Sequence, residues 1–154
     1  AVQREPRPAT DTPGPIAGGD RDAGAIAACA ANAERAGLRA AITWHEGAIS
    51  THPWLDEPGR APERGVLVTN PPFGVRVAKD GSLLPLYQTL GHRAARLGPG
   101  WRVAILAHDV RLARRTGLSL EAAFTTRLGG LAVTALVGPA AAVAAPGLPA
   151  RRGD

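Results

Sequence analysis

The sequence of 154 residues has no methionine, a single cysteine and few aromatic residues, which make up 4% of it. Because Cys29 stands alone, the chain has no intrachain disulfide and no zinc site built from several cysteines, and it suits a reducing compartment. The shortage of aromatic residues means that a core must come mostly from Ala, Val, Leu and Ile. Since residue 1 is alanine and no methionine follows, we expect the chain to be the later part of a longer polypeptide.

The sequence also lacks an uninterrupted apolar run long enough to span a membrane. The stretch 131–148 is the most apolar, but Gly138, Pro139, Pro146 and Gly147 interrupt it, and a spanning helix needs about 20 consecutive apolar residues. We therefore expect a cytoplasmic protein without a membrane partner.

Positive charge exceeds negative charge, with 18 Lys and Arg against 13 Asp and Glu, and the sequence pI is about 10.9. Nearly all of the positive charge is arginine, whose guanidinium group pairs with phosphate oxygens in a fork, so a nucleic-acid partner is admissible. A chain rich in Ala, Gly, Pro and Arg is equally typical of a GC-rich genome. Charge alone therefore does not identify the partner.

Strand patterns and helix patterns alternate along the chain between two irregular ends. Residues 1–15 are expected to form a disordered lead-in and residues 139–154 a flexible Ala/Pro/Arg tail. Strands are predicted at 16–20, 40–45, 65–69 and 101–107, helices at 23–36, 83–97 and 109–116, a loop at 51–64, and a hairpin of 122–128 with 131–137 around Gly129-Gly130. This order predicts one α/β domain over 16–138 with a mainly parallel sheet.

The segment GVLVTNPPFGVRV, residues 65–77, joins a strand to unusual chemistry. Its start is apolar on both faces, as in a central parallel strand, and ligands bind beyond the carboxyl ends of such strands. There the Asn70 side-chain carbonyl and the Pro71 carbonyl offer two acceptors to a planar NH2 group, which frees the nitrogen lone pair. Pro72 makes the corner rigid, and Phe73 offers a face for stacking a flat ring. A plain turn beginning at Asn-Pro is the alternative.

TNPPF, followed by GVRV and LYQTLG, resembles motif IV of class I S-adenosylmethionine-dependent methyltransferases that act on exocyclic or amide nitrogens. The pattern is most similar to the THUMP-associated RNA methyltransferases, the group that contains 23S rRNA guanine-N2 methyltransferases. GGDRDAGAIAACAANAERAG is similar to that group's second strand and helix, GWRVAILAHD to its fifth strand, and TTRLGGLAVTALVG to its closing hairpin. Over residues 16–138 the resemblance implies a Rossmann-like sheet, S-adenosyl-L-methionine as cofactor and rRNA as substrate.

By this resemblance, Asn70 and Pro71 hold the target amino group at the corner that Pro72 completes. Phe73 stacks on the base, and Arg76 fits a basic position that meets RNA phosphate. A solvated loop arginine is an equally good reading of Arg76.

The cofactor side of the site is implied by fewer residues. Asp20 matches the acid that binds the ribose hydroxyls of the cofactor, whereas Asp22 is expected to cap the following helix. The superfamily's adenine-contacting acid has no counterpart at Gly47-Ala48, and Glu46 is a weak substitute. The four histidines lack metal-ligand spacing, so we expect no metal ion and assign none of them to catalysis.

No strand with a glycine-rich loop precedes Ile16, although the family has such a strand in the middle of its sheet. The resemblance therefore implies the C-terminal part of a catalytic domain, with two strand edges left unpaired. We expect this chain alone to be inactive and to bind S-adenosylmethionine poorly. The motif leaves open adenine N6 or a protein glutamine N5 as the acceptor, and also a non-catalytic remnant that binds RNA.

Overall fold

The computed structural model describes residues 14–57, 59–73 and 83–141, which belong to two compact units, Ala1–Ala48 and Ile49–Asp154. The first unit contains β1 (Ile16–Asp20), α1 (Ala23–Arg35), the 3-10 turn η1 (Arg39–Ala41) and β2 (Ile42–Glu46). The second unit contains the 3-10 turn η2 (Ile49–Thr51), α2 (Pro53–Asp56), β3 (Gly65–Thr69), α3 (Leu84–Ala95), β4 (Trp101–Ala107), α4 (Val110–Ala113), the 3-10 turn η3 (Arg114–Thr116), β5 (Glu121–Leu128) and β6 (Leu131–Pro139).

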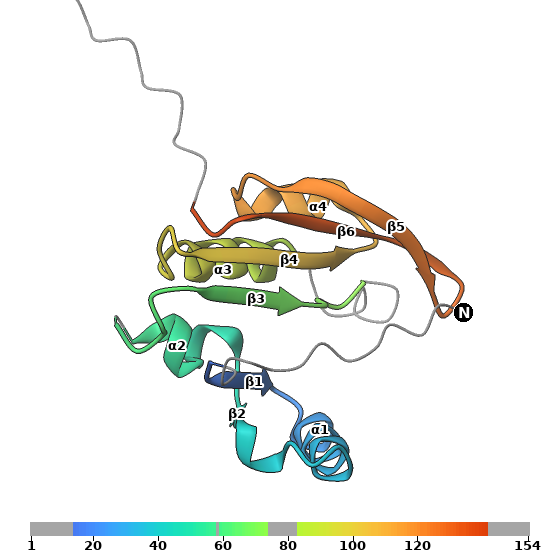
Figure 1. The fold of residues 1–154 in the computed structure, drawn as a ribbon. Coiled ribbons are helices and arrows are strands. Elements are labelled where there is room, and N and C mark those ends of the chain that lie inside the picture. Colours follow the sequence, from blue (N-terminus) through green and yellow to red (C-terminus); the bar gives the residue numbers. More distant parts are fainter. Residues whose placement is uncertain (1–13, 58, 74–82, 142–154) are drawn as a thin grey trace, which may run out of the picture. The chain divides into compact units, whose positions relative to one another are not determined.

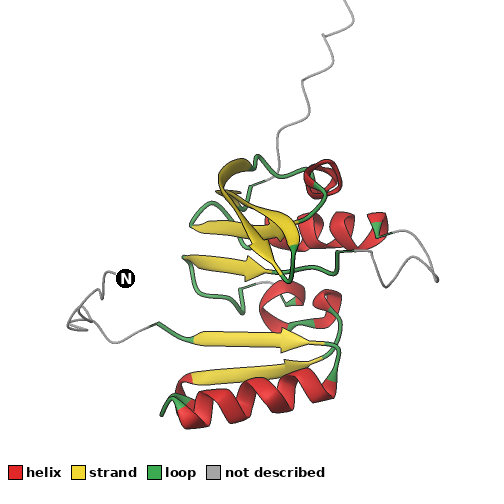
Figure 2. Cartoon of the chain, turned by 90° about the vertical axis from the view of Figure 1, so that its right-hand side faces the viewer, coloured by secondary structure: helices red, strands yellow, loops and turns green. Residues whose placement is uncertain are grey.

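The first unit is a parallel strand pair with one crossover helix. β1 and β2 are paired in register up to Asp20 opposite Glu46, and α1 runs along one face of the two strands (Figure 2). The predicted cap is confirmed, because Asp22 Oδ1 accepts the backbone N–H of Gly24 at 2.7 Å and of Ala25 at 3.2 Å. The pairing brings two carboxylates side by side at the strand ends.

The second unit is a four-stranded sheet with the order β3-β4-β6-β5 (Figure 1). β3 and β4 are parallel, and β6 is antiparallel to both of its neighbours. Most predicted strands and helices are found within two residues of their expected ends, but the helix predicted over 109–116 ends at Ala113 as α4 and continues as the 3-10 turn η3. The sheet is therefore mixed, with parallel pairing of β3 and β4 and the antiparallel hairpin that the sequence predicted at the end of the chain.

The loop predicted over residues 51–64 is also wrong in part, because it contains the short helix α2. Pro53 opens this helix at a position where no backbone N–H is required. The preceding His52 caps it, with Nδ1 accepting the Trp54 N–H at 3.3 Å. The proline that suggested a loop is therefore a helix-start residue.

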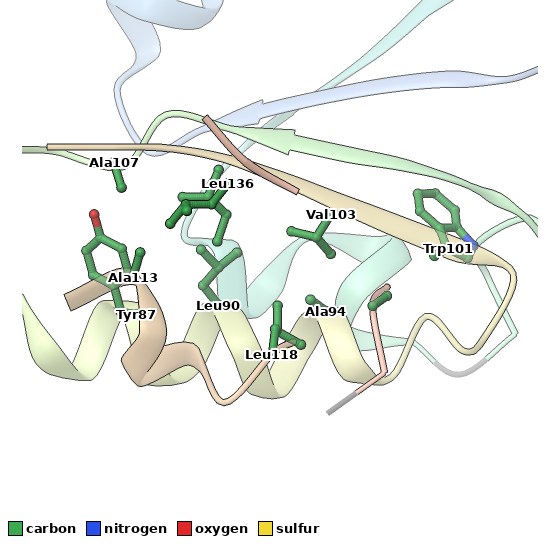
Figure 3. Packing of buried hydrophobic residues seen from close by; sticks show 11 residues of the cluster. Tyr87, Leu90, Ala94, Trp101, Val103, Ala107, Ala113, Leu118 and Leu136 are labelled. Carbon is green, nitrogen blue, oxygen red and sulfur yellow. The ribbon is translucent and has the colours of Figure 1, made fainter. Parts of the chain in front are cut away.

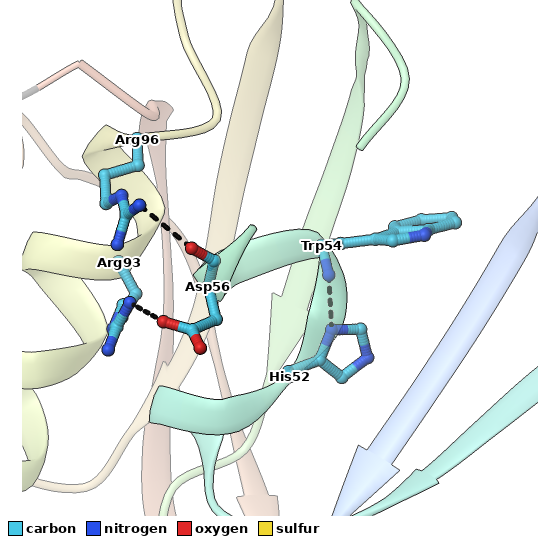
Figure 4. Close-up of polar contacts among 5 residues, drawn as sticks. All are labelled: His52, Trp54, Asp56, Arg93 and Arg96. Atoms are coloured by element: carbon cyan, nitrogen blue, oxygen red, sulfur yellow. Dashed lines mark hydrogen bonds and ion pairs between the residues drawn. The ribbon is translucent and has the colours of Figure 1, made fainter. Parts of the chain in front are cut away.

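α2 is held to α3 through one acidic residue (Figure 4). The Asp56 carboxylate pairs with the Arg93 guanidinium, and the Asp56 backbone carbonyl accepts from Arg96 Nη2 at 2.9 Å. Because the Arg93 side chain is only 19% exposed, the pair is better shielded from water than an ordinary surface ion pair.

The core lies between α3 and the sheet (Figure 3). Tyr87, Leu90 and Ala94 occupy one helical face and point at β4, where Val103 lies opposite them. Ile105 of β4 belongs to the same cluster, and each of the five side chains is at most 1% exposed. Burying one side chain the size of leucine stabilises a fold by roughly 1.5–3 kcal/mol. The predicted aliphatic core is found, with a few aromatic residues added.

The glycine of the LYQTLG segment allows close packing of two backbones. A Cβ atom on Gly91 would lie 1.8 Å from the carbonyl oxygen of Thr116. The Thr116 hydroxyl in turn donates to the Ala113 carbonyl at 2.8 Å, which ties η3 to α4. Backbone contact between α3 and η3 therefore sets the position of the segment that follows β4.

β3 lies at the edge of its sheet. Leu67 faces the core, whereas Val66 and Val68 are 60% and 70% exposed. The expected burial of both faces is therefore wrong for this strand in the described sheet. The unpaired edge that the sequence led us to expect is present within the described residues.

The hairpin at the end of the described chain is confirmed. Gly129 and Gly130 have φ of 54° and 87°, and a two-residue turn with both φ values positive matches the twist of the flanking strands. β6 pairs Thr134 with Ala107, the last residue of β4. Ala132 consequently lies just beyond the end of β4, where the candidate site begins.

Candidate active site

The predicted corner follows β3 directly, at its carboxyl end. Pro71 ends the strand, since it has no N–H to donate and its φ is restricted. Pro71 is buried and Phe73 is half-buried, whereas Asn70 and Pro72 are exposed. The buried proline anchors the corner, and the amide beside it is accessible to a ligand.

The carboxyl end of β4 supplies the neighbouring residues, His108 and Asp109, because β3 and β4 are parallel. Asp109 caps α4, with Oδ1 accepting the backbone N–H of Leu112 at 3.2 Å and of Arg111 at 2.9 Å. These hydrogen bonds, the one from Leu112 first, keep the pKa of Asp109 below its usual 3.8. Burial, helped by the Asp109 charge, raises the pKa of Tyr87 above 10.0. This edge thus carries a fixed carboxylate and a neutral phenol.

A ring contact joins the two strand ends. The centroids of Phe73 and His108 are 6.3 Å apart, with 58° between the ring planes, within the range of attractive ring pairs. His108 Nδ1 lies 2.8 Å from the carbonyl oxygen of Ala132. Because a carbonyl only accepts, Nδ1 carries the proton of this hydrogen bond. The end of β3, the end of β4 and the start of β6 therefore meet through His108.

The first unit carries two acids at its own carboxyl edge. Asp20 and Glu46 are opposite one another in the register of β1 and β2, and both are exposed. Asp20 Oδ1 accepts the Asp22 backbone N–H at 2.9 Å, which holds the carboxylate in one orientation. Such an oriented carboxylate suits the hydroxyls of a ribose.

The predicted site residues are distributed over both units. Asn70, Pro71, Pro72 and Phe73 lie together at the end of β3 in the second unit, and Asp20 lies in the first. Arg76 lies outside the described residues. Within the described ranges, no three His, Cys, Asp or Glu side chains are grouped as a metal site would need.

Sequence reasoning missed His108. The only signal for it is its place directly after a buried strand, since its partners Phe73 and Ala132 are distant in the sequence. The strand predicted over 101–107 places residue 108 at the carboxyl end of a strand, where ligands bind in parallel sheets.

A cavity of about 390 Å³ lies elsewhere in the second unit. Trp54, Pro62, Glu63 and Leu97 are among its lining residues, and they precede β3 or β4. Since Asn70 follows β3, this cavity belongs to the opposite ends of the strands and is not part of the corner.

The comparison with known families decides which proteins share this arrangement. The sequence model of the RMKL-like methyltransferase domain matches residues 2–134. The chain belongs to this family. Its predicted Rossmann-like class I methyltransferase fold is thereby confirmed. In the described residues of this family member, no helix is both long and apolar enough to cross a membrane.

A curated relative from Chromohalobacter salexigens is named ribosomal RNA large subunit methyltransferase K/L. It is 34% identical over 125 residues, which are 81% of this chain and 17% of the relative. The chain therefore spans about a sixth of the length of that protein.

Two solved structures are also similar. SMU.472, named as a methyltransferase and crystallised with SAH, has a TM-score of 0.64 and 26% identity, with 79% of this chain and 30% of the other chain covered. A predicted N6-adenine-specific DNA methylase from Listeria monocytogenes has a TM-score of 0.56 and 29% identity, with 78% and 29% covered.

Proposed function

We propose that this chain supplies the acceptor-binding part of an S-adenosyl-L-methionine-dependent RNA methyltransferase. The acceptor is the exocyclic N2 amine of guanine in 23S rRNA; the name of the relative from Chromohalobacter supports RNA of the large ribosomal subunit as the substrate. Because the relative from Chromohalobacter is a bacterial protein, and bacteria make and assemble ribosomal RNA in the cytoplasm, we place the enzyme there.

The observation that carries this proposal is the exposed amide of Asn70 on a buried proline corner. The Asn70 side-chain oxygen and the Pro71 carbonyl accept the two N–H groups of the target amine. An amine that donates both of its hydrogens in this way has its lone pair available. The Phe73 ring stacks on the base, which is worth about 1–3 kcal/mol per base in nucleic-acid sites.

When bound, S-adenosylmethionine supplies an electrophilic methyl group. Asp20 would hold its ribose hydroxyls, since the oriented, exposed carboxylate accepts hydrogen bonds. The target nitrogen would take this methyl group while the Asn70 side-chain oxygen and the Pro71 carbonyl oxygen hold its two N–H groups. The chain's own contribution is alignment and polarisation of the amine. Arg76 contributes a contact to RNA phosphate.

Adenine N6 is the second candidate acceptor, favoured by the likeness to the predicted adenine-specific DNA methylase from Listeria. Adenine presents the same NH2 geometry to two acceptors, so the corner by itself serves both bases. Mass spectrometry of the methylated nucleoside distinguishes N2-methylguanosine from N6-methyladenosine.

The experiment is Asn70→Ala in the full-length polypeptide, with rRNA from a strain that lacks the enzyme as substrate. Loss of one positioned hydrogen-bonding group at a reacting centre typically lowers kcat by about 10²–10³. We expect that loss with little change in RNA affinity, because Phe73 remains. Gln88→Ala, on the exposed face of α3, is the matched control and should retain full activity.

Three outcomes would count against the proposal. Unchanged turnover in Asn70→Ala removes the assigned role of the amide. N6-methyladenosine as the product supports the second candidate. RNA binding by the wild-type protein without any methylation indicates a non-catalytic RNA-binding remnant.

A further inference from the structure

We propose that His108 is a positioning residue for the acceptor site, which holds the Phe73 ring in the orientation that stacks on the target base. This inference rests on the proposed function, because it gives Phe73 the role of the stacking ring. It assigns a role to a histidine that no motif marks.

The argument begins with how firmly His108 itself is held. Its Nδ1–H donates to the Ala132 carbonyl at 2.8 Å, and that carbonyl belongs to β6, the strand that pairs with β4 along six residues. His108 also follows directly from β4. The imidazole is therefore fixed by two paired strands although it is exposed to solvent.

Phe73 needs such a support more than a core residue does. It is only half-buried, and it follows two prolines beyond Thr69, where the pairing of β3 with β4 ends. Its ring makes a tilted contact with His108, with 6.3 Å between centroids. A ring that is already oriented loses less conformational freedom when a base stacks on it, so binding is tighter.

The size of the effect follows from ring pairs in proteins. Such pairs add a stabilisation that corresponds to about a 2- to 13-fold change in an equilibrium constant. We therefore expect His108→Ala to raise the KM for RNA about 2- to 13-fold. The kcat should stay within about twofold, since the amine-binding groups Asn70 and Pro71 are unchanged.

Two further variants separate the ring from the hydrogen bond. His108→Asn keeps an N–H donor for Ala132 but removes the ring, and it should raise KM as the alanine variant does. His108→Phe keeps a ring beside Phe73 and should restore part of the affinity. His92→Ala, an exposed histidine on α3, is the control and should leave both constants unchanged.

A double-mutant cycle measures whether the effects of the His108 and Phe73 substitutions on KM depend on each other, which a general structural role of His108 would not produce. If His108 acts through Phe73, then His108→Ala has no further effect on KM in the Phe73→Ala background. All variants are measured in the full-length polypeptide on rRNA, with kcat and KM determined separately.

An unchanged KM in both His108→Ala and His108→Asn overturns the inference, and so does an undiminished effect of His108→Ala in the Phe73→Ala background. These results leave the proposed function intact, because the wild-type protein still methylates RNA. If the wild-type protein methylates no RNA, the proposed function is refuted and this inference is refuted with it. If His108→Ala does not fold, the KM values of His108→Asn and His108→Phe test the inference in its place.

Discussion

Replacement of Gly91 by alanine in α3 has two opposite effects on stability, because helix propensity favours alanine and packing disfavours it. In an exposed helix, alanine is more favourable than glycine by about 1 kcal/mol. At position 91, however, the new Cβ would lie 1.8 Å from the Thr116 carbonyl oxygen, and real Cβ atoms essentially never approach closer than 3.0 Å. The carbonyl must therefore retreat by at least 3.0 − 1.8 = 1.2 Å.

Both partners in this contact are backbone, so neither can move aside as a flexible side chain would. Overpacking a well-filled core costs about 1–3 kcal/mol, and we expect the upper end here. After the gain of about 1 kcal/mol from propensity, the net loss is about 2 kcal/mol. For a domain of this size, that corresponds to a fall in Tm of about 4–8 °C.

Urea and thermal unfolding followed by tryptophan fluorescence measure this change, because Trp101 is 4% exposed and belongs to the core that α3 covers. Gln88→Ala in the same helix is exposed and should shift the free energy of unfolding by less than about 0.5 kcal/mol. A rise in Tm for Gly91→Ala, as propensity alone requires, would refute the backbone contact between α3 and η3.

Two further predictions concern titration and cofactor binding. Tyr87 is the single tyrosine of the chain, so its ultraviolet absorbance should report half-ionisation above pH 10.0. Because the fold favours the neutral phenol, Tyr87 contributes its full stabilisation of the folded state below pH 10, and this contribution is lost as the pH rises from 10 through the raised pKa. Ionisation of Tyr87 at or below pH 10 in the folded protein would contradict its burial. By calorimetry, the 154-residue chain should not bind S-adenosylmethionine at micromolar concentration. Hydrogen bonds that the exposed carboxylates of Asp20 and Glu46 accept contribute about 1.5–3 kcal/mol each. Their sum stays below the roughly 8 kcal/mol that a micromolar Kd requires, so such a Kd would disprove this estimate.

Local rules made most of the elements predictable. Asp22 caps α1 through its own side chain, and Gly129 and Gly130 make the turn that joins β5 to β6. Both depend on residues within three positions of one another. For the same reason, the sequence predicts two hydrogen-bond acceptors at Asn70 and Pro71, since a strand, an amide and a proline corner are adjacent along the chain.

Long-range pairing is where prediction from the sequence failed. The apolar β3 has the pattern of a strand buried on both faces, but in the described sheet its Val66 and Val68 are exposed. The proline-rich loop hid α2, because Pro at a helix start and Pro in a loop have the same local pattern. In each case the outcome depends on which other segment packs alongside.

The sequence by itself determined most of the secondary structure, the capping and turn residues and the proline corner after β3, because these depend on backbone preferences and on neighbouring side chains. Only the tertiary structure decided that Gly91 meets Thr116 and that His108 lies between Phe73 and Ala132. Those contacts join residues 24 or more positions apart. They arise from strand pairing and helix packing, which no local pattern of residues specifies.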